Sequence, residues 1–378
     1  MSGESSLGSR TDSLLGDRRF AWLLDPKLVS VAIGSVAVVV VAGLIQVSFG
    51  SYSMTLSQAW AAVFNPEVVL NRQAWSAFLF GGEMPEMSRE SLIIWNIRLP
   101  RVFVAILVGM NLAVSGAIFQ AVTRNELASP FILGVSSGAG LAILLTLVVF
   151  GSLTAFLPLI ASLGGAGAFL LVYAIAWKGG TSPVRLVLAG VIVGTVFGSL
   201  QTALFFFAED VVVVQSAIAW TTGSLTGTDW QQVRLALPWT LVSIPLAVAG
   251  SRQCNVLLLG ERTARSLGMS IERVRFALSG VAVLAAAASI AVAGIVGFVG
   301  LIVPHVVRNL VGSDYRKLMV GCLFVGPALM VGADAGARLG MSVLVGTETQ
   351  IPVGIVTGLI GGPYFLYLMR RQQHMGEI

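Results

Sequence analysis

The residues that could carry chemistry are few, and their neighbours exclude the common energy-converting sites. The chain has three lysines, which follow Pro26, Trp177 and Arg316, whereas a phosphate-binding P-loop needs a lysine directly after glycine. Its two cysteines, Cys254 and Cys322, belong to no CxxC pair and to no cluster with histidine. The sequence offers no paired carboxylates and no nucleophile with a base at usable spacing. We therefore expect no catalytic residue, no metal site and no cofactor on this chain.

The composition is that of a membrane protein. Hydrophobic residues make up 56% of the chain and charged residues 11%, and the mean hydropathy is +0.88. These values lie far from the balance of a soluble domain. The 43 glycines suit helices that pack closely through small residues. The sequence thus predicts an all-α, polytopic membrane protein.

Apolar runs of membrane length, bounded by charge, predict ten transmembrane helices. They cover residues 28–49, 101–122, 131–149, 156–177, 185–207, 234–251, 275–295, 297–311, 317–334 and 353–370. A polar N-terminal tail, 1–27, precedes this transmembrane domain of 28–370, and a short tail, 371–378, follows it. The first run is too long for the apolar part of a signal peptide, so we interpret it as a retained helix.

Lysine and arginine predict the orientation. Most of them fall on one side of the ten helices, the side that holds both chain termini. By the positive-inside rule, we expect both termini in the cytoplasm and the protein in the cell membrane. The acidic residues fall in loops or at predicted helix ends, as Asp210 and Asp334 do, which disfavours coupling to protons or sodium without excluding it.

One cytoplasmic segment, 252–275, is half apolar and half cationic, with five arginines against two glutamates. Gly260 and Gly268 bracket about two helical turns, from Glu261 to Leu267, whose apolar and charged positions can separate onto two faces. Such a helix can lie on lipid headgroups or dock on another protein. The pattern alone leaves both alternatives open.

A set of short residue strings occurs in order along the chain, beginning at Arg98. They are Arg98-Leu99-Pro100-Arg101, Gly116-Ala117 with Gln120, Arg124-Asn125, Leu133-Gly134-Val135-Ser136-Ser137-Gly138-Ala139, Leu259-Gly260-Glu261, Ser266-Leu267-Gly268, Gly297-Phe298-Val299-Gly300-Leu301-Ile302-Val303-Pro304-His305 with Arg308, Ala333-Asp334 with Arg338, and Pro352-Val353-Gly354. From about residue 98 to 369, this ordered set resembles the FecCD-type permeases, the membrane subunits of ABC importers for iron chelates, haem and vitamin B12.

The resemblance implies a ten-helix subunit of the type II importer kind. Its implied partners are two ATP-binding subunits that hold ATP and Mg, an extracytoplasmic substrate-binding protein, a second copy or a related permease, and membrane lipid, with no nucleic acid. The implied function is translocation of a ferric-siderophore type chelate, and the alternatives are cobalamin or haem. An ion-coupled secondary transporter is the alternative from another class.

The resemblance also assigns roles to particular residues. Coupling to the ATPase is implied for Leu259, Gly260, Glu261, Arg262, Ala264, Arg265, Ser266, Leu267 and Gly268. Docking of the binding protein is implied for Arg98, Arg101 and Arg338, which would otherwise be read as anchors at the headgroups. A role in the translocation path or its gate is implied for Ser136, Ser137, Thr181 and Ser182.

The chain departs from the family pattern at two places. Glu126 and Ser129 stand where proline and aspartate are usual, and Gln350 stands where glutamate is usual. The first departure changes the shape of a loop. The second leaves no carboxylate to carry any role of that glutamate.

Overall fold

The computed structural model describes residues 21–48, 54–208, 210–344 and 350–374, which form helices joined by turns, with no strand among them. Ten helices correspond to the ten apolar runs: α1 (Pro26–Ser48), α6 (Leu99–Thr123), α7 (Val135–Leu144), α8 (Leu157–Ala176), α9 (Pro183–Phe205), α11 (Trp230–Ala249), α14 (Ile271–Ala293), α15 (Val299–Val311), α16 (Tyr315–Leu344) and α17 (Val353–His374). The all-α prediction is confirmed. Most of the predicted N-terminal tail, 1–20, lies outside the described residues, as does 375–378.

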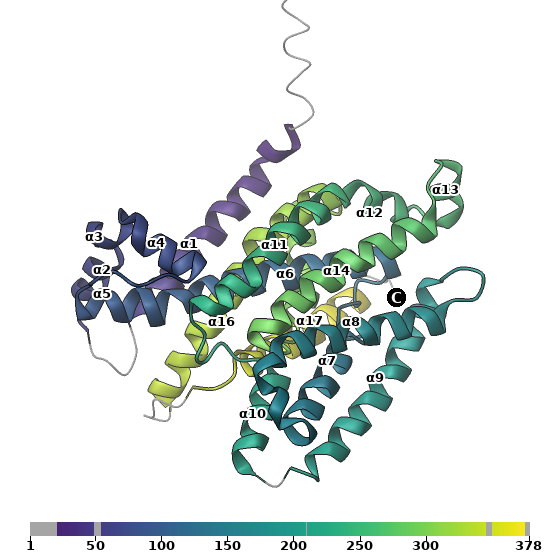
Figure 1. Ribbon diagram of the computed structural model, residues 1–378. Helices are drawn as coiled ribbons and strands as arrows, with labels where there is room; N and C mark the ends of the chain where they lie inside the picture. Colours follow the sequence, from purple (N-terminus) through teal and green to yellow (C-terminus); the bar gives the residue numbers. More distant parts are fainter. Residues whose placement is uncertain (1–20, 49–53, 209, 345–349, 375–378) are drawn as a thin grey trace, which may run out of the picture.

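Shorter helices connect these ten. They are α2 (Leu56–Val63), α3 (Pro66–Val69), α4 (Arg72–Phe80), α5 (Arg89–Ile93), α10 (Val211–Thr222), α12 (Ser251–Leu258) and α13 (Glu261–Ser266), with short 3-10 helices η2 (Ala21–Leu24) and η5 (Gly151–Phe156) and short π-helical segments η3 (Ile94–Arg98) and η4 (Leu145–Val149). In Figure 1, α2 to α5 gather at the left of the molecule and α13 projects at the upper right.

Seven described helical segments are long and apolar enough to cross a membrane: Pro26–Ser48, Arg89–Thr123, Gly151–Ala176, Pro183–Phe205, Trp230–Ala249, Ile271–Ala293 and Tyr315–Gly340. The apolar segments Val135–Val149, Val299–Val311 and Val353–Tyr367 are shorter. At 1.5 Å per residue, the 13 residues of α15 extend only about 20 Å, less than the hydrocarbon core. The number of ten spans is therefore not confirmed.

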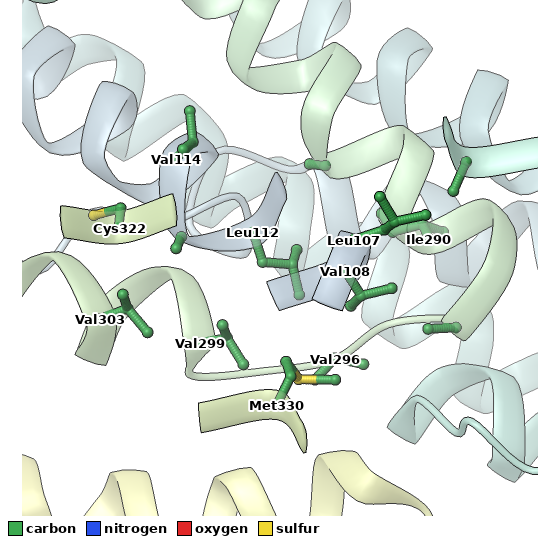
Figure 2. Close-up of a cluster of buried hydrophobic side chains, with 14 of the residues drawn as sticks. Leu107, Val108, Leu112, Val114, Ile290, Val296, Val299, Val303, Cys322 and Met330 are labelled. Carbon is green, nitrogen blue, oxygen red and sulfur yellow. The ribbon is translucent and has the colours of Figure 1, made fainter. Parts of the chain in front are cut away.

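Helix α6 is the centre of the bundle. It packs against α16, α14, α15 and α11, and 83% of its most apolar stretch is buried, against 17% for α1. Figure 2 shows Leu107, Val108 and Leu112 of α6 facing Ile290 of α14 and Met330 of α16. A helix that is apolar on all sides is typical of such a central position.

Glycine lets neighbouring backbones approach α6 closely. A Cβ atom at Gly116 would lie 1.7 Å from the carbonyl oxygen of Gly300 in α15, and one at Gly109 would lie 2.4 Å from that of Gly326 in α16. Because lipid tails are as apolar as the helix surfaces, close packing of this kind is a main source of helix association in membranes. Glycine at these positions is thus explained by the close approach of the α6 backbone to those of α15 and α16.

Helix α16 corrects one predicted boundary. The apolar run was predicted to end at Asp334, but the helix continues to Leu344 and encloses both Asp334 and Arg338. The charges do not end the helix because both have partners inside the protein, Arg101 for Asp334 and the carbonyl of Gln46 for Arg338. A charge paired in this way can lie within a span.

Substitution of Gly116 tests the packing around α6. We expect Gly116→Ala to lower the free energy of unfolding in detergent by about 1–3 kcal/mol, because the added methyl group meets the backbone of Gly300. The matched control is Gly280→Ala in α14, where a Cβ meets nothing within 4 Å, and we expect no loss there. Equal thermal stability of both variants would contradict this account of the packing.

Candidate coupling, gate and docking sites

Polar contacts gather the charged residues at two opposite ends of the bundle. At the end that carries α13, Asn255 of α12 donates a hydrogen bond to Asp314, at 2.8 Å, and Lys317 pairs with Asp25. At the end that carries α2 to α5, Gln46, Asp334 and the start of α6 meet. We call these the α13 end and the α2–α5 end (Figure 1).

Helix α13 is bounded by the two glycines that the sequence singles out. Gly260 has a φ of +94° and Gly268 a φ of +79°, values that L side chains rarely adopt. The Gly268 amide donates to the carbonyl of Arg265 at 2.9 Å, and the next amide reaches back to Ala264 at 3.0 Å, which closes the last turn. The predicted helix from 261 to 267 is observed over Glu261–Ser266.

The predicted coupling residues divide into two groups by their exposure. Ala264 is buried, and Gly260 and Glu261 are half-buried. The outward-facing members are Leu259, Arg262, Arg265, Ser266, Leu267 and Gly268, and Leu259 and Leu267 are 59% and 62% exposed. The outward surface of α13 is thus both apolar and cationic, as expected of a surface that another protein covers. Its role in coupling remains a prediction.

Arg275 is one of the five arginines of the segment 252–275. Its side chain is buried, with 1% exposed. Its Nη2 donates to Glu261 at 2.9 Å, and its Nη1 donates to Glu272 at 3.2 Å and to the carbonyl of Thr181 at 2.7 Å. We call these four residues the Arg275 cluster. It joins α13, the start of α14 and the turn between α8 and α9.

The predicted gate residues lie in two different places. Thr181 is 3% exposed and belongs to the Arg275 cluster, and Ser182 caps α9, accepting a hydrogen bond from the Arg185 amide at 3.2 Å. Ser136 and Ser137 lie in the first turn of α7, and the hydrogen bonds of Ser137 join it to Gly134 and Gln201 rather than to Thr181.

Helix α7 uses its small residues for packing. A Cβ atom at Gly138 would lie 2.2 Å from that of Ala168 in α8, so this face of α7 has no free space. Ser136 is 5% exposed, and the carbonyl of Ser137 accepts a hydrogen bond from Gln201 of α9 at 3.0 Å. The absence of a side chain at Gly138 therefore serves the close packing of α7 against α8. A role of Ser137 in the path remains a prediction.

At the α2–α5 end, the predicted docking arginines are engaged inside the protein. Arg101 is 4% exposed and donates through Nε and Nη2 to both carboxylate oxygens of Asp334, at 2.8 and 2.7 Å. Arg98 is also 4% exposed and donates to the carbonyl of Val47. Arg338 is half-buried. A docking protein cannot reach the Arg101 guanidinium without breaking its pair with Asp334, and docking remains a prediction.

Two further residues contact the Arg101–Asp334 ion pair, and the sequence alone did not identify them as partners. Gln46 of α1 donates to Asp334, and Gln350, which stands where the family has glutamate, accepts a hydrogen bond from Arg101. Asp334 is 0% exposed and lies inside α16, so its assignment to a helix end was wrong. Arg101 and Gln46 thus occupy the carboxylate oxygens of Asp334 within the fold.

Asp314 fastens α12 to the start of α16. Partial burial raises the pKa of its carboxyl, but hydrogen bonds from Arg316 and Asn255 outweigh burial and lower the pKa from 3.8 to about 2. Asn255 also accepts a hydrogen bond from the Tyr315 amide at 2.9 Å. The base of the α12–α13 segment is thus held by hydrogen bonds to a carboxylate that is ionised at neutral pH.

Two cavities lie beside the start of α11. One, of about 310 Å³, lies between Trp220, Ser224, Gln231 and Gly294, and the other, of about 570 Å³, is lined by Gly81, Asn96 and Arg234. None of the predicted path or gate residues lines either of these two cavities. Among the described residues, no group of three or more His, Cys, Asp or Glu side chains could hold a metal ion.

These features define a multi-pass helical membrane protein with separate polar sites at its two ends. The model of the FecCD transport family matches residues 38–371, which is most of the chain. The chain therefore belongs to the FecCD transport family.

Individual relatives agree with this assignment. The chain is 39% identical over 288 residues to the Fe(3+)-citrate import system permease protein YfmD of Bacillus subtilis, covering 76% of this chain and 84% of the relative. It is 40% identical over 291 residues to the cobalamin import system permease protein BtuC of Halobacterium salinarum, covering 77% and 76%. A solved inward-facing ABC transporter of the metal-chelate type superposes with a TM-score of 0.75 at 27% identity, over 90% of this chain and 99% of that one.

Replacement of Asp334 tests the buried ion pair. We expect Asp334→Asn to lower the free energy of unfolding by about 3–5 kcal/mol, because it leaves the Arg101 guanidinium buried without a negative partner. The measurement is thermal or denaturant unfolding in detergent. Glu83→Gln makes the same chemical change at an exposed position of the same end and should change stability by less than about 0.5 kcal/mol. Similar losses in both variants would refute the importance of the pair.

The lowered pKa of Asp314 predicts that the stability of the folded protein depends on pH. Since its pKa is lower in the folded protein, the stabilisation is fully present above about pH 4 and is lost as the pH falls through about 2. At pH 7, Asp314→Asn should therefore melt at a lower temperature than the parent, and the difference should shrink as the pH approaches about 2. Melting curves at several pH values check this. A difference that is the same at pH 7 and near pH 2 would contradict it.

Proposed function

We propose that the chain is the membrane permease subunit of an ABC importer that translocates a ferric chelate of the siderophore type. The subunit makes no covalent bond to its cargo. It alternates the accessibility of a path through the membrane, and ATP hydrolysis on a partner subunit sets the direction of transport. The relatives named as permease proteins of import systems support this function.

The outward surface of α13 is the observation that carries the proposal. It presents Arg262 and Arg265 on a short helix that glycines bound at both sides, with exposed Leu259 just before the helix and exposed Leu267 just after it. An ATP-binding subunit that covers this surface would bury the two leucines and could pair with the arginines. Two ATP-binding subunits then serve two permease chains, either two copies or two related proteins.

The orientation follows from the same surface. We place the α13 end in the cytoplasm, where ATP is, and the α2–α5 end outside. The cationic character of α13 and its neighbours supports this placement by the positive-inside rule. With all ten apolar runs counted as spans, including the short α7, α15 and α17, both termini lie in the cytoplasm. The short helices would then cross where the bundle, rather than lipid, surrounds them.

The extracytoplasmic binding protein would dock on the α2–α5 end. Arg338 is the accessible member of the three docking arginines, whereas Arg98 and Arg101 shape the surface from beneath. Acidic residues on the binding protein would pair with Arg338 and with exposed arginines of the same end, such as Arg72. Pairs of this kind steer the encounter and fix the orientation of the complex.

The cargo has a second candidate. The 40% identity to a cobalamin import system permease supports cobalamin as this second candidate, since cobalamin is, like a ferric siderophore, a bulky metal complex. Proteoliposomes that contain the permease, its ATPase and its binding protein separate the candidates. We expect ATP-dependent accumulation of a radiolabelled ferric siderophore, and accumulation of cobalamin or haem instead would overturn the choice of cargo.

Negative charge introduced on and beside α13 tests whether the ATPase docks there. Leu267→Glu and Arg265→Glu place negative charge on the outward surface, so we expect co-purification of the ATPase to fall by about tenfold or more. Glu261 is unsuitable for this test because it holds Arg275. Arg72→Glu, an equal reversal at the exposed start of α4, is the matched control and should leave co-purification unchanged. Unchanged co-purification in both α13 variants would refute the docking of the ATPase on this surface.

A further inference from the structure

We propose that Arg275 is a positioning residue that transmits a displacement of α13 to the first turn of α9. This inference rests on the proposed function, since it takes α13 as the element that the ATPase moves. It concerns the next step, the route by which that movement enters the transmembrane helices.

The Arg275 cluster ties the turn before α9 at several atoms. A single carboxylate oxygen of Glu272 accepts hydrogen bonds from the backbone amide and the hydroxyl of Thr181, at 3.0 and 2.7 Å. Arg275 donates to the carbonyl and the hydroxyl of the same residue, at 2.7 and 3.0 Å. All three polar groups of Thr181 are thus held from α14, and the residue cannot move independently of Arg275 and Glu272.

Thr181 in turn controls the start of α9. The next residue, Ser182, is the N-cap of this helix, and Arg185 in its first turn donates to the carbonyl of Gly180 at 2.6 Å. A displacement of residues 180–182 therefore displaces the cap and the first turn together. Helix α9 otherwise packs mainly against α7 and α8, so the polar cluster is its principal link to α14 at this end.

Glu261 supplies the link to α13. It is the first residue of α13, its side chain is 33% exposed, and it pairs with Arg275 at 2.9 Å. Partner contact with the outward surface of α13 thus reaches Arg275 through one charge-assisted bond. The planar guanidinium binds Glu261, Glu272 and Thr181 at once, a geometry that a lysine ammonium group cannot reproduce with the same rigidity.

Burial makes this cluster a stiff connection. Arg275 is 1% exposed and Thr181 3%, so water does not compete freely for their hydrogen bonds. Gly180, with a φ of +134°, lies so close that an added Cβ would stand 3.2 Å from a Glu272 oxygen. Small shifts of the guanidinium are therefore passed to the turn and are not absorbed by loose packing.

The test uses the complete complex of permease, ATPase and binding protein in proteoliposomes. Arg275→Met removes the connection and leaves the outward surface of α13 unchanged. We expect ATPase binding and ATP hydrolysis to persist, while substrate transported per ATP falls by about tenfold or more, because the substitution removes both ion pairs of Arg275 and both of its hydrogen bonds to Thr181. Arg273→Met removes an exposed arginine two positions away and is the matched control, with transport per ATP unchanged.

Distances between spin labels separate transmission from a merely structural role. Both native cysteines are buried, and burial raises the pKa of the Cys254 thiol to about 12, so neither competes for the label. Labels at Thr263→Cys and Leu241→Cys follow α13, and labels at Val184→Cys and Leu241→Cys follow the start of α9. Thr263, Val184 and Leu241 are exposed, and none of them belongs to the predicted coupling residues. In the parent, addition of nucleotide should change both the α13 distance and the α9 distance. In Arg275→Met it should change the α13 distance only.

The remaining outcomes would contradict either the role of Arg275 or the proposed function. The inference would be overturned if Arg275→Met transported as much substrate per ATP as Arg273→Met. It would also be overturned if the α9 distance in Arg275→Met still responded to nucleotide. Should Arg275→Met fail to fold, Arg275→Lys keeps the charge, and an α9 response as large as the parent's would overturn the inference equally. A parent complex that neither binds the ATPase nor uses ATP would instead refute the proposed function.

Discussion

A buried charge has to find its partners inside the protein, and the structure depends on two arginines that do so at opposite ends of the bundle. Arg101 pairs with Asp334 at the α2–α5 end, and Arg275 pairs with Glu261 and Glu272 at the α13 end. Burying either charge without these partners would cost several kcal/mol. Each pair therefore fixes how neighbouring helices lie relative to one another.

Between these two ends, packing decides the arrangement. Helix α6 approaches α15 and α16 at glycine contacts, and the cluster in Figure 2 fills the space around it. Such contacts keep the bundle rigid, so that a force applied at one end can displace whole helices. The polar clusters and the close-packed centre thus together fix the positions of the helices at both ends of the bundle.

The sequence predicted the helices well because their signal is local. Apolar length located the main helices, and Gly260 and Gly268 marked the limits of α13. The burial of Arg275 and the pairing of Asp334 had no such signal. Their partners Thr181 and Arg101 lie 94 and 233 positions away, and only the packing of α6, α14 and α16 brings them together. The end of α16 had no local signal either. The helix was predicted to stop at Asp334, but it continues because that carboxylate pairs with Arg101 inside the protein.

We infer that ATP on a partner subunit, rather than an ion gradient, drives transport by this chain. Membrane vesicles that contain the complete system allow the two energy sources to be removed separately. We expect accumulation of the ferric chelate to stop when ATP is depleted and to continue when an ionophore collapses the proton gradient. Accumulation that persists without ATP and disappears with the gradient would contradict it and would establish a secondary transporter.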